Sequence, residues 1–188
     1  MTDNPVFQSL DDFVSKLIAM QPEAPSINFD SDWPSACYLE PKKEGDPVTW
    51  RPAKQPSLSD MFQRLENALE EKIHPDLISF YSRYWSDPLP ATCPDGDLTL
   101  IQVWNEEDME RLRENLIGHA LSKRQQKRPL TFFIACPEPD DNYLISVDNF
   151  SGAVLLETPG KPPIRHLADN LNDFINNLVP RPVKGTEK

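Results

Sequence analysis

Proline is the feature that most restricts the fold of this chain. Twenty of its 188 residues are proline, roughly double the average frequency of about 5%. Proline lacks a backbone N–H donor and fixes φ, so it interrupts helix interiors and central strands. Because many prolines lie before residue 60 and between residues 88 and 94, we expect segments 21–56 and 86–95 to form long irregular connections.

Outside these segments, apolar residues recur every three or four positions, which is the spacing of amphipathic helices. Ser and Asn side chains accept hydrogen bonds at helix starts, and proline is tolerated as the first helical residue. The expected helices are residues 6–20, a helix capped by Ser57 or Ser59, a helix opening at Pro75, a helix capped by Asn105 with Asp108 three residues on, and residues 166–178.

Short runs rich in β-branched and aromatic residues predict strands. These runs are residues 36–39, 48–50, 98–103, 130–136, 143–147 and 154–157. Helices therefore come first, then consecutive strands interrupted by one helix, then a closing helix. This order favours an α+β fold, a single compact domain with a mostly antiparallel sheet packed by helices. We expect the domain to span residues 1–180 and residues 181–188 to form a disordered tail.

The sequence lacks the usual patterns of catalytic and metal sites. Three cysteines are widely spaced without a CxxC pair, the three histidines show no HxxxH spacing, and the six glycines form no phosphate-binding loop. We therefore expect no catalytic residue, no metal site, no cofactor and no disulfide scaffold. One alternative pairs Cys136 as a nucleophile with His119 as its base. Against it, Cys136 ends an apolar run, where cysteine usually serves as a small core residue.

Charge and hydropathy restrict the partners. The formal net charge is −11, so the surface repels phosphate backbones and anionic lipid headgroups, and nucleic acid is not an expected partner. No apolar run approaches the roughly 18 residues of a spanning helix, and the N-terminus lacks the basic start of a signal peptide. We expect a protein inside the cell whose natural complement is a basic protein segment, although acidity also serves solubility alone.

The acidic excess is concentrated in residues 61–120. This third of the chain holds 12 acidic and 5 basic residues, a difference of seven. On the helix capped by Asn105, a 100° step per residue separates an apolar side from an acidic side. The apolar side is Met109, Leu112, Leu116 and Ala120, and the acidic side is Glu107, Glu110 and Glu114. A solvated helix face, with acids near the N-terminus, is the simplest interpretation.

Two features of this helix need a separate explanation. Gly118 lies in the helix interior, where glycine costs about 1 kcal/mol relative to alanine. It therefore predicts that the second half of the helix contacts another layer closely, either within the domain or from a partner. The helix also ends in a basic cluster, for which neutralising the helix macrodipole is the favoured explanation. The basic cluster is Lys123, Arg124, Lys127 and Arg128.

The run Glu114-Asn115-Leu116-Ile117-Gly118-His119, preceded by Trp104 and Glu106-Glu107-Asp108, resembles the signature of the Syd family. The resemblance extends over nearly the whole chain and is densest from residue 96 to 178. Further matching positions are Trp33-Pro34-Ser35, Val48, Trp50, Phe80-Tyr81, Phe133–Ala135, Ile145–Val147, Asn149, Ser151-Gly152, Glu157, Leu167–Leu171 and Phe174. Segments 21–56 and 86–95 and the C-terminal tail depart from the family pattern.

The resemblance implies a compact domain related to the SUKH superfamily. It implies a monomer loosely associated with the cytoplasmic side of the bacterial inner membrane through SecY, the channel subunit of the protein translocase. Family members are thought to check or restrain poorly complexed SecY, using an electronegative concave surface against its basic cytosolic loops. Contact with the membrane would then be indirect. The superfamily also contains immunity proteins, so an inhibitor of a toxin nuclease is the alternative.

The acidic surface fits this implied partner. Cytoplasmic loops of membrane proteins carry an excess of Lys and Arg, and an acidic protein is steered to them with an affinity that falls as salt rises. We expect the partner-binding residues to lie on the acidic helix and on the nearby loop before it. The candidates are Glu106, Glu107, Asp108, Glu110, Glu114, Asp95 and Asp97.

Overall fold

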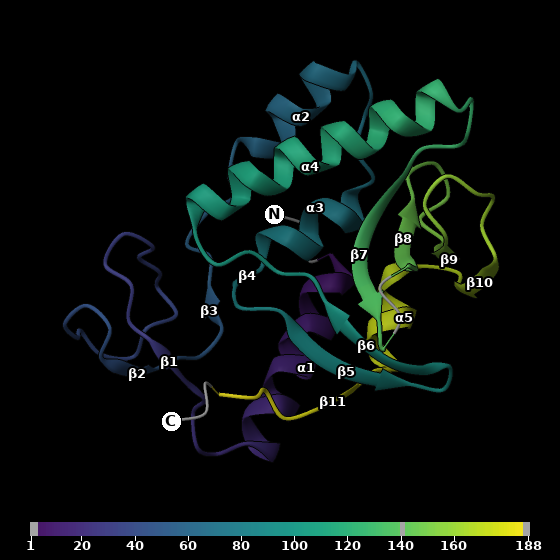
Figure 1. Ribbon diagram of the computed structural model, residues 1–188. Helices are drawn as coiled ribbons and strands as arrows, with labels where there is room; N and C mark the ends of the chain where they lie inside the picture. The colour runs from purple at the N-terminus through teal and green to yellow at the C-terminus, as the bar shows by residue number, and fades with distance from the viewer. Residues whose placement is uncertain (1–3, 140–141, 186–188) are drawn as a thin grey trace.

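The computed structural model describes residues 4–139 and 142–185 (Figure 1). Its helices are α1 (Pro5–Met20), α2 (Met61–Leu69), α3 (Pro75–Ser82), α4 (Glu106–Gln125) and α5 (Leu171–Asn176). Its strands are β1 (Ser26–Asn28), β2 (Pro47–Thr49), β3 (Ala53–Lys54), β4 (Tyr84–Trp85), β5 (Leu89–Cys93), β6 (Gly96–Leu100), β7 (Thr131–Pro137), β8 (Leu144–Asp148), β9 (Val154–Glu157), β10 (Arg165–Ala168) and β11 (Val179–Pro180).

A seven-stranded sheet organises the domain. Its strand order is β10-β9-β8-β7-β6-β5-β11, and every neighbouring pair is antiparallel. Two short antiparallel pairs, β1-β2 and β3-β4, lie outside it. This architecture confirms the predicted α+β fold with an antiparallel sheet packed by helices.

The helices form two groups around the sheet. Helix α1 packs against α3 and α5, whereas α2 packs along α4, and α4 contacts β7. Figure 1 shows α2 and α4 side by side along one edge of the molecule, with α1 at the other end behind β5 and β6. Of the apolar residues whose spacing predicts the first helix, Leu10, Val14 and Leu17 are buried, whereas Phe7 is half-buried and Ile18 is 40% exposed. The helix is confirmed, but its buried face also includes Val6 and Phe13.

The predicted starts of α3 and α4 are confirmed, whereas the N-cap residue of α2 is Asp60 and not Ser57 or Ser59. Asn105 Oδ1 accepts from the Asp108 backbone N–H at 2.8 Å, and Asp108 Oδ2 accepts from the Trp104 N–H at 2.8 Å. The first bond satisfies a donor that the first turn of α4 would otherwise leave free, and the second satisfies the N–H of the residue before the cap. Ser59 Oγ accepts from the Met61 N–H at 3.1 Å at the start of α2, and Pro75 is the first residue of α3.

Three predicted elements differ in the structure. Segment 86–95 contains β5 rather than an irregular connection. The Pro90 carbonyl accepts from the Arg181 N–H at 2.9 Å. In a strand the nitrogen and the carbonyl of one residue point to the same side, so the Pro90 nitrogen also faces β11. Because β11 has only two residues, the N–H that proline lacks costs the sheet little. The helix expected over 166–178 is divided into β10 and a shorter α5, because Asn170 caps the helix only from Leu171 onward. Residues 36–39 form no strand beyond a single bridge between Tyr38 and Trp50.

The start of the expected tail is held by specific contacts. The Arg181 guanidinium Nη1 lies 3.1 Å from Asp97 Oδ2. The Val183 N–H donates to Gln21 Oε1 at 2.9 Å, and the Val183 carbonyl accepts from Gln21 Nε2 at 3.0 Å. Residues 181–183 therefore contact the rest of the domain, residues 186–188 lie outside the described part, and the expected division into a domain of residues 1–180 and a tail of residues 181–188 stays a prediction.

The second half of α4 contacts the sheet through β7 and β9, but Gly118 does not mark the point of closest approach. Apart from its chain neighbours and its own helix backbone, a Cβ atom placed on Gly118 would meet no described atom within 4 Å. The neighbouring Leu121 is 54% exposed, so this face of α4 is open. No tight approach of another backbone explains the glycine among residues 4–139 and 142–185, and contact with a partner remains a prediction.

We expect Gly118→Ala to stabilise the domain by about 1 kcal/mol, because alanine restricts the unfolded chain and favours the helix. Chemical denaturation measures the change. The matched control is Gly152→Ala, which we expect to destabilise by roughly 1–2 kcal/mol: φ is +79° there, and a Cβ would come within 2.7 Å of the His74 ring. A loss of stability in Gly118→Ala would contradict the open face.

Candidate functional site

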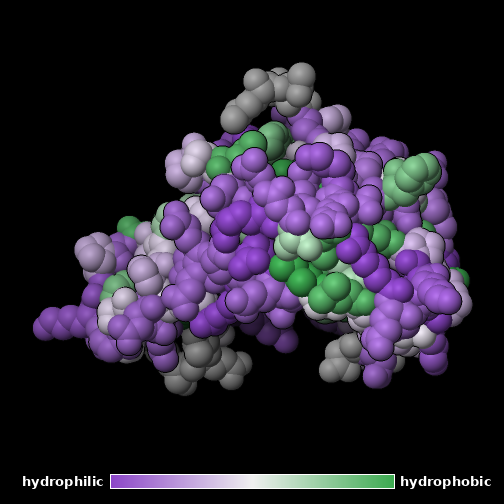
Figure 2. Space-filling view, turned by 90° about the horizontal axis from the view of Figure 1, so that it is seen from above, coloured by the Kyte–Doolittle hydropathy of each residue, from purple (hydrophilic) through white to green (hydrophobic). Residues whose placement is uncertain are grey.

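Helix α4 presents its acidic start on the molecular surface. Its apolar stripe is buried as predicted, at Met109, Leu112, Leu116 and Ala120. Glu106, Glu107 and Glu114 are exposed on the other side. Figure 2 views the molecule from the side of α2 and α4, where hydrophilic residues cover most of the surface and hydrophobic side chains gather in smaller areas.

Two of the candidate carboxylates, Asp108 and Glu110, already have hydrogen-bond partners within the domain. Glu110 accepts from Arg64 Nη1 at 2.9 Å, from Arg64 Nη2, and from Arg113 Nε at 3.0 Å. The Arg64 hydrogen bonds are the main reason that the pKa of Glu110 is lowered to about 2. This pairing joins α4 to α2, and Asp108 is committed to capping. Both acids therefore position α4 and are less available to a partner.

The remaining acids of α4 are freer. Glu107 lies 3.4 Å from Arg111, with both side chains more than half exposed, so this pair contributes little. Glu106 and Glu114 form no ion pair within the described residues. Glu106, Glu107 and Glu114 are thus the carboxylates that the structure leaves open to a cation.

Two adjoining hollows flank the start of α4 and share Glu106 and Trp85 in their walls. The first, of about 280 Å³, lies against Pro34–Ala36, Trp104 and Asn105. The second, of about 370 Å³, is lined by Pro56, Ser57, Ser59, Asp60, Arg64 and Glu110. The second hollow brings three carboxylates and one guanidinium together beside an indole ring. A side chain that combines a positive charge with an apolar stem matches this surface.

The proline-rich segment 21–56 builds one wall of the first hollow. Trp104 Nε1 donates to the Trp33 carbonyl at 3.2 Å, and Ser35 Oγ donates to the Trp104 carbonyl at 2.6 Å. The Trp104 ring packs edge-on against Tyr38 and Trp50, with centroids 5.2 and 5.5 Å apart. Hydrogen bonds and aromatic packing thus hold an irregular segment against α4.

Sequence reasoning missed Asp60 and Trp85 as neighbours of the acidic helix. Neither residue lies on α4, and no local pattern connects residues 60, 85 and 106. Asp87 is a further acid near this region, and burial, followed by the charge of Asp108, raises its pKa. The quoted family positions Trp33 and Trp104 were the available signal for the aromatic part of the site.

Asp95 and Asp97 belong to a different surface. They lie at the β5–β6 hairpin, whose turn is on the right of Figure 1, whereas α4 begins on the left. Asp95 Oδ1 lies 2.9 Å from Arg165 Nη2, and Asp97 pairs with Arg181. The structure therefore does not bring these two acids together with the acids of α4.

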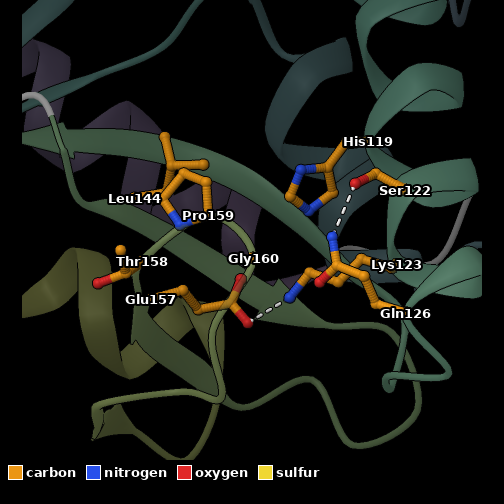
Figure 3. A pocket seen from close by; sticks show the side chains of 9 residues that line it. All are labelled: His119, Ser122, Lys123, Gln126, Leu144, Glu157, Thr158, Pro159 and Gly160. Atoms are coloured by element: carbon orange, nitrogen blue, oxygen red, sulfur yellow. Dashed lines mark hydrogen bonds and ion pairs between the residues drawn. The ribbon is translucent and has the colours of Figure 1, made fainter.

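A second polar cluster joins the other end of α4 to the sheet (Figure 3). Lys123 Nζ lies 2.6 Å from Glu157 Oε1, and Thr131 Oγ1 donates to Glu157 Oε2 at 2.8 Å. His119 Nε2 lies 3.4 Å from Thr131 Oγ1. Burial, and next the charge of Lys123, lower the pKa of His119. Of the predicted basic cluster, Lys123 is thus paired inside the domain.

The structure does not form the alternative nucleophile–base pair. His119 contacts Thr131 and Phe133 near the start of β7, whereas Cys136 lies five residues beyond Thr131 on the same strand, about 16 Å away along an extended chain. Within the described residues, no group of three or more His, Cys, Asp or Glu side chains is placed to hold a metal ion. The same residues contain no helix with the length and apolar character needed to span a bilayer.

Comparison of this sequence with known proteins identifies one family. The family model described as Syd protein (SUKH-2) matches residues 7–180. The chain is 43% identical over 180 residues to Protein Syd of Pseudoalteromonas atlantica, covering 93% of this chain and 96% of the relative. It is 43% identical over 173 residues to Protein Syd of Alteromonas mediterranea, covering 91% and 94%. Protein Syd of Psychromonas ingrahamii is 34% identical over 179 residues, covering 95% and 96%.

We expect Arg64→Gln to raise the pKa of Glu110 from about 2 toward its ordinary value of 4.5, because the main stabilising hydrogen bonds are lost. A carboxyl whose pKa is depressed by folding stabilises the folded state above the unfolded pKa, and this contribution is lost as pH falls from about 4.5 to 2. Side-chain NMR titration measures the pKa. Arg111→Gln is the control, and an unchanged Glu110 pKa in Arg64→Gln would contradict the pairing.

Proposed function

The chain belongs to the Syd family, and from this premise we propose that it binds SecY at the cytoplasmic side of the bacterial inner membrane. In this proposal it recognises poorly complexed SecY and checks or restrains it. The acidic start of α4 contacts the basic cytosolic loops of SecY. The protein acts as a monomer, reaches the membrane only through SecY, and takes no part in catalysis or nucleic-acid binding.

Charge complementarity supports this partner. The chain carries a net charge of −11, and cytosolic loops of membrane proteins are enriched in Lys and Arg. Attraction between such surfaces speeds association and weakens as salt screens it, with a Debye length of about 8 Å at physiological ionic strength. Direct insertion into lipid is not required.

The observation that carries the proposal is the position of Glu106. Glu106 and Trp85 line both hollows, and Asp60 lines the second one with them. A Lys or Arg side chain entering either hollow could pair with Glu106 while its aliphatic stem packs on the indole ring. Glu107 and Glu114 extend the acidic surface along α4 and supply further charge for neighbouring basic residues.

The other predicted residues contribute less directly to the proposed contact with SecY. Asp108 and Glu110 hold α4 in position through the Trp104 N–H and Arg64. Asp95 and Asp97 form a second acidic contact for a longer SecY loop, although Arg165 and Arg181 reduce the charge they offer. The immunity-type alternative is not favoured, because the relatives bear the name Protein Syd.

We expect the triple variant Glu106→Lys, Glu107→Lys and Glu114→Lys to abolish recovery of SecY from detergent-solubilised inner membranes, since it replaces attraction by repulsion at the proposed contact. The unmodified protein should recover SecY at 50 mM salt and lose most of it at 500 mM, where charge pairing is screened. Quantitative immunoblotting of SecY measures both results, and circular dichroism checks that the variant is folded.

The matched control reverses Asp12, Glu23 and Asp169, which are exposed on or beside α1 and before α5. It makes the same change in net charge away from the start of α4, so it should retain most SecY binding. If both triple variants lost SecY binding equally, overall charge and not the start of α4 would explain the loss. Full binding by the α4 variant would overturn the site.

A further inference from the structure

A cavity of about 290 Å³ lies at the opposite end of α4 from the acidic hollows. It is formed where the end of α4, the start of β7 and the loop after β9 meet. Its apolar walls come from Pro129, Leu155, Pro162 and Pro163, and its polar groups include Lys123 and Arg128. Its place in the fold makes it separate from the proposed SecY contact.

A second, smaller cavity lies next to this one, and buried polar groups form the wall between the two. Lys123 and Glu157 line both cavities, and their ion pair therefore forms part of the shared wall. Figure 3 shows this pair from the smaller cavity, with His119 and Lys123 extending from α4 and Glu157 facing them from β9. Because Lys123 is only 8% exposed and Glu157 2%, the wall is part of the interior.

The acids of the larger cavity already have partners. Glu157 accepts from Lys123 and from Thr131. Asp148 Oδ1 accepts from the Ser151 N–H at 2.8 Å, from Ser151 Oγ at 2.8 Å and from the Phe150 N–H at 3.2 Å in the β8–β9 turn. Both carboxylates therefore already have hydrogen-bond donors, and neither requires an added cation.

Arg128 is the cation of this cavity that forms no ion pair within the described residues. It lines the cavity, whereas Lys123, the other cation of the wall, is occupied by Glu157. A charged acceptor binds a guanidinium more strongly than a neutral one does. The guanidinium therefore marks the position for an anionic group of a ligand.

The size and lining of the cavity restrict that ligand further. An apolar cavity of about 150 Å³ holds one benzene ring, so about 290 Å³ accommodates a phenylalkyl or branched alkyl group together with a carboxylate. A guanidinium matches the planar carboxylate geometry. Because Asp148 and Glu157 line the same cavity, a singly charged carboxylate is favoured over a doubly charged phosphate.

We propose that this cavity binds a carboxylate carried by an apolar group, with the carboxylate on Arg128 and the apolar group against Leu155 and the three prolines. The ligand is either a small free acid or the C-terminal carboxylate of a protein chain that ends in an apolar residue. Both sources present the same chemistry to the cavity.

The test is a titration of the ¹⁵N-labelled full chain followed by NMR. The probes are 3-phenylpropionate, its amide, a hexapeptide ending in Phe with a free carboxylate, and the same peptide amidated. We expect at least one acid to shift the amide resonances around Leu155, Thr131 and Arg128 in a saturable way. Its amide should bind at least tenfold more weakly, and the stronger of the two acids identifies the source.

The variant Arg128→Gln should weaken the acid at least tenfold, whereas the matched control Lys127→Gln should not. Lys127 is the exposed neighbour with the same charge and does not line the cavity. The proposal is overturned if neither acid shifts these resonances at 10 mM, if acid and amide bind alike, or if Arg128→Gln binds as well as the unmodified protein. The acid–amide comparison in the unmodified protein stays decisive if Arg128→Gln does not fold.

Discussion

The buried ion pair between Lys123 and Glu157 is the interaction on which the arrangement of this domain depends. Burying two charges is costly, and their attraction offsets that cost only when the remaining hydrogen-bonding atoms are also satisfied. Here Thr131 satisfies the second oxygen of Glu157. Removing one partner of such a pair costs roughly 3–5 kcal/mol, so the pair fixes α4 against β7 and β9. The direction of α4 then determines where its acidic start projects.

The two ends of α4 are divided between structure and recognition. At the C-terminal end, Lys123 pairs with Glu157, and Arg124 donates to the Leu69 carbonyl at 2.6 Å. At the N-terminal end, Arg64 and the Asn105 cap occupy Glu110 and the first-turn backbone. The charged groups without an ion-pair partner among the described residues differ in sign: Glu106 and Glu114 are acidic and lie on α4, and Arg128 is basic and follows its C-terminal end. This difference in charge underlies the two proposed contacts, a basic protein loop at the start of α4 and a carboxylate near its end.

Local sequence patterns predicted the elements whose burial follows a single period. The stripe from Met109 to Ala120 is buried as its spacing indicates, and so are Leu10, Val14 and Leu17 of α1, although the buried face of α1 includes Val6 and Phe13 and leaves Ile18 exposed. Prediction failed where distant contacts decide the outcome. Strand β5 forms despite Pro90 because its neighbour on that side is only two residues long, and the turn at Asn170 divides a run whose apolar spacing resembles one helix.

The candidate site was predicted in part for the same reason. The acids of α4 could be assigned to one face by helical geometry, but the partners that occupy Glu110 and the hollows beside Glu106 involve residues far away in sequence. The pair Lys123–Glu157 spans 34 positions and leaves no local signal. Gly118 did not identify a close contact within the described residues, because the low helix propensity of glycine gives a cost in free energy and does not tell what offsets that cost.

Site-specific photo-crosslinking tests whether the start of α4 lies against a cytosolic loop of SecY. A photoreactive amino acid is placed at position 106, 114 or 23, one at a time, and irradiated with inner membranes. We expect crosslinks to a basic cytosolic loop of SecY from positions 106 and 114 and none from position 23. Crosslinks from position 23, with none from 106 or 114, would contradict it.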